Sequence, residues 1–134
     1  MVKVLDVPVR VKAAIQANTK AGGTTPLQFE IDPRIGFQYS INIPKGEYWV
    51  LVDAWIESSQ TPDGKAILFR NDTDIVARTP NINTMDVSNN SRPRIGKVLF
   101  KEFDKITGVF INAADVGTAG ATVYFHLLFK RVTD

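Results

Sequence analysis

His126 is the residue best suited to acid–base chemistry or metal binding, and it is the only histidine among 134 residues. Metal sites usually combine several His, Cys or carboxylate ligands, yet the chain has no cysteine and no second histidine. It also has no Gly-x-Ser-x-Gly nucleophile elbow. Strand alternation places His126 on one face with Thr122, Tyr124, Leu128 and Lys130. We therefore predict a strand histidine, with no catalytic residue, no cofactor and no metal. An enzyme on a small β-barrel that uses His126 is kept as an alternative function.

Two tryptophans, Trp49 and Trp55, lie six positions apart in the stretch 48–56, with Asp53 between them. Simple alternation predicts that both indoles share one face of a strand, about 20 Å apart. If that face is exposed, the pair is typical of the sugar-stacking platform of a carbohydrate-binding module. If it is buried, both indoles fill the core or a subunit interface, which is where large aromatic residues usually lie. We favour burial and keep the carbohydrate-binding module as the alternative function.

A group of basic residues at 92–105 begins at the end of the irregular stretch 79–96, which is rich in Asn, Ser, Pro and Asp. Such a group can bind phosphate or an acidic partner surface. Glu102 and Asp104 interrupt it, no aromatic residue is interleaved through the irregular stretch for base stacking, and the net charge of the chain is only +2. Nucleic acid is therefore not an expected partner of the basic stretch 92–105. The candidate interaction residues are Trp49, Trp55, Arg92, Arg94 and Lys97.

Alternating apolar residues predict the strands that must position these side chains. The stretch 48–56 is apolar on both faces and predicts a central strand buried on both sides. The stretch 5–16 predicts a long first strand with one apolar face, in which Pro8 indicates a sheet edge or a bulge. The stretch 37–43 predicts a half-buried strand that forms a hairpin with 48–56 through the turn at 44–47.

Eight or nine short strands separated by turn signals, without an amphipathic helix, predict an all-β fold. We expect an antiparallel two-sheet β-sandwich with jelly-roll or Greek-key topology. The length predicts one domain over 1–134, in which 1–25 form an N-terminal strand or arm and a linker.

The composition, with 44% hydrophobic and 22% charged residues, is ordinary for a globular protein. No apolar run approaches the roughly 20 residues that span a bilayer, so we expect no membrane span. The first eleven residues alternate in polarity, and we expect no secretion signal. These features predict a protein that stays in the cell that makes it or leaves inside a larger particle.

A resemblance rests on the arm at 2–15, the sandwich strands and the closing pattern Ile111-Asn112-Ala113 … Gly117-Thr118-Ala119-Gly120-Ala121-Thr122-Val123. This layout resembles small β-sandwich structural proteins of virions, which include capsid, decoration and turret proteins of double-stranded DNA viruses. The resemblance implies a non-enzymatic homo-oligomer, a trimer or pentamer, with other capsid proteins as further partners. It also implies synthesis in a host cytoplasm and a final location in the virion.

Overall fold

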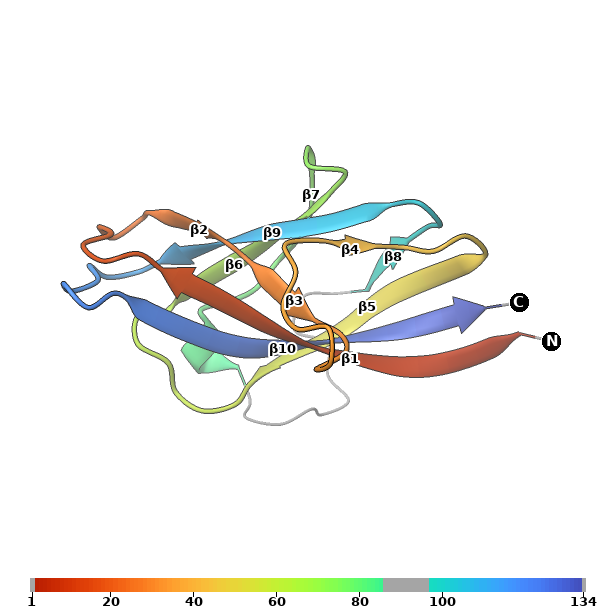
Figure 1. Ribbon diagram of the computed structural model, residues 1–134, viewed down its shortest axis with the longest axis horizontal. Helices are drawn as coiled ribbons and strands as arrows, with labels where there is room; N and C mark the ends of the chain where they lie inside the picture. The colour runs from red at the N-terminus through yellow and green to blue at the C-terminus, as the bar shows by residue number, and fades with distance from the viewer. Residues whose placement is uncertain (1, 86–96, 134) are drawn as a thin grey trace.

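Ten β-strands in two antiparallel sheets make up almost all of the regular structure (Figure 1). The computed structural model describes residues 2–85 and 97–133. The strands are β1 (Lys3–Ile15), β2 (Thr24–Pro26), β3 (Gln28–Glu30), β4 (Ile41–Asn42), β5 (Glu47–Ile56), β6 (Gly64–Arg70), β7 (Asp74–Arg78), β8 (Val98–Phe100), β9 (Lys105–Asn112) and β10 (Ala121–Thr133). One 3-10 turn, η1, covers Ile82–Thr84. Within the described residues, no helix is long and apolar enough to cross a membrane.

The connections between these strands define a jelly-roll-like sandwich. One sheet has the order β3-β1-β10-β5-β8, and the other has the order β2-β9-β6-β7 with β4 added to β9. Every connection except β6 to β7 carries the chain from one sheet to the other, so strands that are neighbours in sequence are rarely neighbours in a sheet. The predicted all-β antiparallel sandwich is confirmed.

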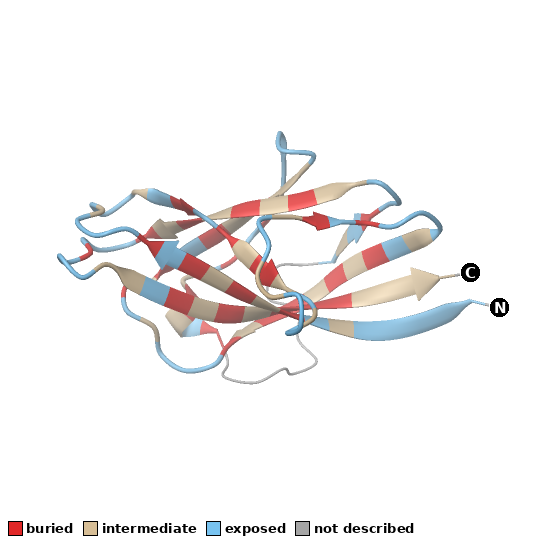
Figure 2. Cartoon of the chain, viewed as in Figure 1, coloured by how far each residue is buried: buried red, intermediate tan, exposed pale blue. Residues whose placement is uncertain are grey.

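The first and last strands pair along their whole length and supply much of the core. Lys3 lies opposite Thr133 and Ile15 opposite Ala121, with no break in register. Val9, Val11 and Ala13 turn inward and are fully buried, as are Phe125 and Leu127 across the ladder. Figure 2 shows this alternation in the second part of β1, whereas the part near the N-terminus is exposed. The long first strand is therefore confirmed, but its apolar face is covered only from about Val9 onward.

The hairpin expected between 37–43 and 48–56 does not form. The only strand in the first stretch is β4, and Ile41 pairs with Ile106 of β9 in the opposite sheet. Gln38 makes an isolated bridge to Phe29. Alternation indicates that a segment is half-buried, but it carries no information about which strand is the partner.

Strand β5 is an inner strand of its sheet, between β10 and β8, and β10 is the middle strand. Strand β5 contains a β-bulge, because Asp53 pairs with Leu128 whereas Leu51, two residues earlier, pairs with the next residue of β10, Phe129. The extra residue, Val52, reverses the inward and outward positions along β5. The outer face is only partly covered, and Tyr48 is 48% exposed, so the prediction of burial on both faces holds for part of the strand only.

The close packing of Gly108 of β9 against the neighbouring strand β6 and Leu27 can be tested by substitution. A β-carbon there would lie 2.6 Å from Leu27 Cδ1 and 2.8 Å from the backbone oxygen of Ile67. We expect Gly108→Ala to lower the free energy of unfolding by about 1–3 kcal/mol, because a backbone oxygen cannot move aside locally. Urea unfolding measures this change. Gly117→Ala is the matched control, since a β-carbon at Gly117 meets nothing within 4 Å; equal stability of the two variants would contradict the packing.

Candidate interaction surface

The two tryptophans lie on opposite faces of the sheet, so the prediction that both indoles share one face is wrong. Trp49 is 4% exposed and packs edge-on against Phe129, with 5.5 Å between ring centroids. Trp55 lies beyond the bulge on the outer face and stacks on His126, with centroids 5.2 Å apart and planes 9° from parallel. The bulge at Val52 inserts one residue between them and breaks the alternation that the prediction assumed. A carbohydrate site that uses both indoles is therefore contradicted.

Only one of the three basic candidates lies within the described residues. Lys97 is exposed just before β8, whereas Arg92 and Arg94 lie outside the described residues. Lys105 Nζ lies 3.1 Å from Asp72 Oδ2, so its charge is partnered within the chain. Of the three basic candidates, Lys97 is thus the one whose exposure the structure describes.

A polar and aromatic cluster occupies the outer face of the first sheet, and we call it the outer-face cluster: Arg10, Trp55, Glu57, Tyr124 and His126. The guanidinium of Arg10 donates from Nε to Glu57 Oε1 at 2.5 Å and from Nη2 to Oε2 at 3.2 Å. Arg10 also lies over the Tyr124 ring, 4.1 Å from its centroid. His126 Nε2 lies 3.0 Å from Glu57 Oε1. Because a carboxylate only accepts, Nε2 carries the proton in this contact.

The contact with Arg10 keeps Glu57 of the outer-face cluster ionised. The hydrogen bond from Arg10 is the main reason that the pKa of Glu57 is lowered, and the same bond raises the pKa of Arg10. Glu57 is therefore ionised at neutral pH and acts as an acceptor for both Arg10 and His126. The side chains bonded to His126 in the described residues include no hydroxyl or thiol, so the arrangement of a hydrolase triad is not seen there. The described residues also contain no group of three or more potential metal ligands.

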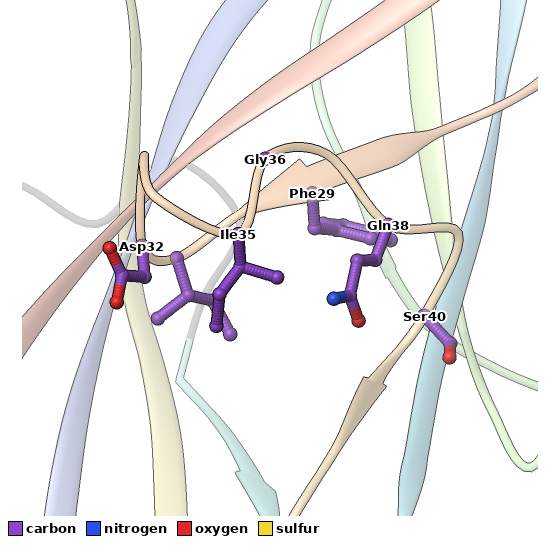
Figure 3. A pocket seen from close by; sticks show the side chains of 7 residues that line it. Phe29, Asp32, Ile35, Gly36, Gln38 and Ser40 are labelled. Carbon is purple, nitrogen blue, oxygen red and sulfur yellow. The ribbon is translucent and has the colours of Figure 1, made fainter.

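A small cavity lies beside β3, at the loop that follows it (Figure 3). Its volume is about 170 Å³, below the roughly 300 Å³ at which ligand pockets begin. The walls are mainly apolar, from Phe29, Ile31 and Ile35. Asp32 points its carboxylate away from Phe29, and Arg34 donates to it at 3.0 Å. This cavity therefore offers neither the room nor a free charged group to hold a cofactor.

The strand β1 has an open side along part of its length. Strand β3 pairs with it only at residues 10–12, and no strand in the described part of the chain covers that side of residues 3–9. We call this segment the open edge. Pro8 lies within it and causes no break in register with β10, so of the two predicted alternatives, a sheet edge or a bulge, the structure shows the edge.

Exposed apolar side chains lie on the outer face of the first sheet, from the open edge of β1 across to β8. Val4 is 58% exposed and lies in register with Val132, which in turn lies beside Tyr48, so the three form one row on the outer face. In β8, Leu99 is 48% exposed and pairs with Val50 in the next row. We call these five residues the terminal patch: Val4, Tyr48, Val50, Leu99 and Val132. On the inner face of β1, Leu5 is 47% exposed. Contiguous apolar surface of this kind marks contact sites on proteins.

Sequence reasoning found part of this surface and missed the rest. The missing donor of Pro8 indicated an edge or a bulge, of which the structure shows the edge, and the placement of His126 with Tyr124 and Leu128 on one face is confirmed. Arg10 and Glu57 were missed, because 47 and 69 residues separate Glu57 from Arg10 and His126 and no local motif joins them.

Comparisons with known proteins give no family. No protein-family model matches the chain, and no curated protein sequence matches it. Among solved structures, the chain is similar to the crystal structure of murine APRIL at pH 8.0, with 13% identity and a TM-score of 0.43. The alignment covers 98% of this chain and 100% of that chain. A similarity this distant carries no argument about activity or partners, so function is argued from the surface itself.

Fluorescence quenching tests the opposite placement of the two indoles. We expect acrylamide to quench the Trp49→Phe variant, which retains Trp55, more strongly than the Trp55→Phe variant, which retains the buried Trp49. The reason is that the quencher must reach the indole to act. Equal and strong quenching of both variants would restore a shared exposed face.

The outer-face cluster predicts a pH-dependent contribution to stability. Because the pKa of Glu57 in the folded chain lies below its ordinary value of 4.5, its ion pairs stabilise the folded state above that value. We expect Glu57→Gln to lose up to about 1 kcal/mol at pH 7, a small figure because the pair is about one-third exposed. The difference from the unmodified protein should disappear as pH falls from 4.5 through the lowered pKa. Unfolding at pH 7 and at acid pH measures it, and a difference that persists in acid would contradict the assignment.

Proposed function

We propose that this chain is a non-enzymatic structural protein that acts by self-association, as a capsid or capsid-accessory component of a virion. The single observation that carries self-association is the exposed apolar surface at one end of the sandwich, where Leu5 lies at the open edge of β1 and the terminal patch extends from Val4 across the outer face to β8. A sandwich that assembles with copies of itself needs such a surface on a rigid scaffold. The virion location extends the layout resemblance and is part of the same proposal.

The burial of side chains supports this surface as a contact rather than a defect of packing. On the same strands, inward residues from Val9 onward are fully buried, so this sheet does form a complete core. Within the strands of this sheet, the exposed large apolar residues are Val4, Leu5, Tyr48 and Leu99. They lie toward the end where the first and last strands run side by side to the termini in Figure 1. Removing apolar side chains from water at about 25 cal/mol per Å² is the force that a partner copy would use.

The chemistry on the outer face favours a non-enzymatic role. Glu57 is held by Arg10 and His126, and the imidazole face of His126 is covered on one side by Trp55. In this arrangement each charged group already has its partner within the chain. The cluster therefore stabilises the sheet rather than leaving a base free for a substrate.

Solution mass tests self-association. We expect static light scattering over a range of concentrations to give a multiple of the 14.9 kDa chain mass. Leu99→Ser with Tyr48→Ser should reduce that mass, because both side chains are about half exposed in the terminal patch and their loss leaves the core intact. Ile75→Ser, exposed to 49% on β7 of the other sheet, is the matched control. A strict monomer at all concentrations would overturn the proposal.

A further inference from the structure

We propose that the open edge of β1 pairs antiparallel with the open edge of a second copy of this chain, about a two-fold axis at Leu5. This inference rests on the proposed self-association and specifies one contact of it, the one at the open edge. The pairing would join the two first sheets into one continuous sheet across the dimer. An uncovered strand edge presents unpaired N–H and C=O groups, which are complementary to the same edge of another copy.

The backbone groups that face the open side can be assigned from β3. Phe29 exchanges two backbone hydrogen bonds with Gln38, at 2.6 and 2.8 Å, so its N–H and C=O point away from β1. Gln28 and Glu30 therefore face β1, where they pair with Lys12 and Arg10. By alternation, the even-numbered residues Pro8, Asp6 and Val4 also turn their backbone groups to this side.

Pro8 fits this assignment, because its missing N–H falls on the side where β10 needs no donor. The ladder from β1 to β10 thus stays intact through the proline. The open edge retains the donors of Val4 and Asp6 and the acceptors of Val4, Asp6 and Pro8. Pro8 also limits the pairing to a short stretch, which protects the edge against continued strand addition.

The length of the open edge and the pattern of side chains select the register. With Leu5 on the axis, Val4 lies opposite Asp6 of the second copy, and Val2 lies opposite Pro8. The second strand then ends just before Arg10, where β3 begins to cover β1. Moving the axis to Asp6 would oppose two carboxylates and place Val2 of the second copy on Arg10, the position that β3 already covers.

Moving the axis the other way, to Val4, is also less favourable. On the inner face it would oppose Leu5 to the charged Lys3, and on the outer face it would oppose Val2 to Asp6. The axis at Leu5 instead brings together the two Leu5 side chains, each 47% exposed in the single chain, and places Val2 against Pro8. Asp6 is already paired with Lys130 Nζ at 2.6 Å, so its charge stays partnered beside Val4.

This contact is isologous, since the same residues contribute from both copies, and it closes at a dimer. The expected trimer or pentamer needs a separate, cyclic contact. A purely trimeric or pentameric mass without a two-fold contact would therefore overturn the edge pairing while leaving self-association in place.

Disulfide trapping tests the register directly, because the chain has no native cysteine. In the proposed pairing, Leu5→Cys places two thiols in a non-hydrogen-bonded pair with Cα atoms about 4.5 Å apart, within disulfide range. Lys3→Cys is the matched control on the same strand and face. The two substituted residues, one in each chain, would be four positions out of register, which separates them by about 13 Å along the strands. Ile35→Cys, 67% exposed on a loop, reports random collision.

We expect mild oxidation of dilute protein to give a cross-linked dimer for Leu5→Cys and only the collision level for Lys3→Cys and Ile35→Cys. Equal cross-linking of Leu5→Cys and Lys3→Cys would show a loose terminus rather than a fixed pairing, and would overturn the proposal. No cross-linking of Leu5→Cys in a protein that light scattering shows to be oligomeric would also overturn it, and would leave the proposed function standing.

Backbone substitution gives an independent test. Val4→Pro removes a backbone donor that faces the open side. The ladder to β10 and the melting temperature should be preserved, because the native Pro8 already lies in that ladder without breaking its register. We expect the dimer dissociation constant to rise at least about tenfold, because the donor is lost at two symmetry-related sites. Val4→Ala keeps the N–H and is the matched control for loss of the side chain. Equal dissociation constants for Val4→Pro and Val4→Ala would contradict the pairing.

Discussion

The uninterrupted pairing of the first and last strands is the constraint on which the rest of this fold depends. β1 and β10 hold each other over thirteen residues, near the middle of one sheet. The chain must therefore begin and end in the same sheet, and it does so by crossing between the sheets at almost every connection. Their inward residues form the floor of the core, against which the second sheet packs. Such long-range pairing is costly to initiate, but once formed it fixes the registers of both strands.

A single inserted residue in β5 separates a tryptophan that packs in the core from one that packs on the outer face. Before the bulge, Trp49 turns inward to Phe129, which also lies 6.2 Å from Phe100, so the aromatic rings fill one end of the core. After it, Trp55 turns outward and becomes part of the outer-face cluster. Asp53 Oδ1 accepts the N–H of Ala54 at 2.8 Å beside the bulge, which helps to satisfy the backbone there. The outer face thus acquires its aromatic character from a backbone irregularity.

The two exposed regions of the first sheet differ in how many of their polar groups and apolar side chains have partners within the chain. In the outer-face cluster, Arg10, Glu57 and His126 bond to one another across three segments of the chain. Near the termini, by contrast, β3 covers only three residues of β1 and leaves backbone groups and apolar side chains without partners in the described part of the chain. Surface that is already satisfied gains little from a partner, whereas an uncovered edge gains hydrogen bonds and apolar burial together.

The sequence by itself determined the fold class, because strict alternation in segments such as 5–16 and 121–132 is incompatible with helix. It also determined that His126 shares a face with Tyr124, since this follows from local periodicity. The missing donor of Pro8 limited that residue to a sheet edge or a bulge, and the structure shows the edge. Only the tertiary structure decided which strands pair, as the failed hairpin at 37–56 shows. It also decided the separation of Trp49 from Trp55, because a bulge changes parity without changing composition. Arg10, Glu57 and His126 meet only when β1, the end of β5 and β10 are brought together, so their contact is a property of the topology and not of any local pattern.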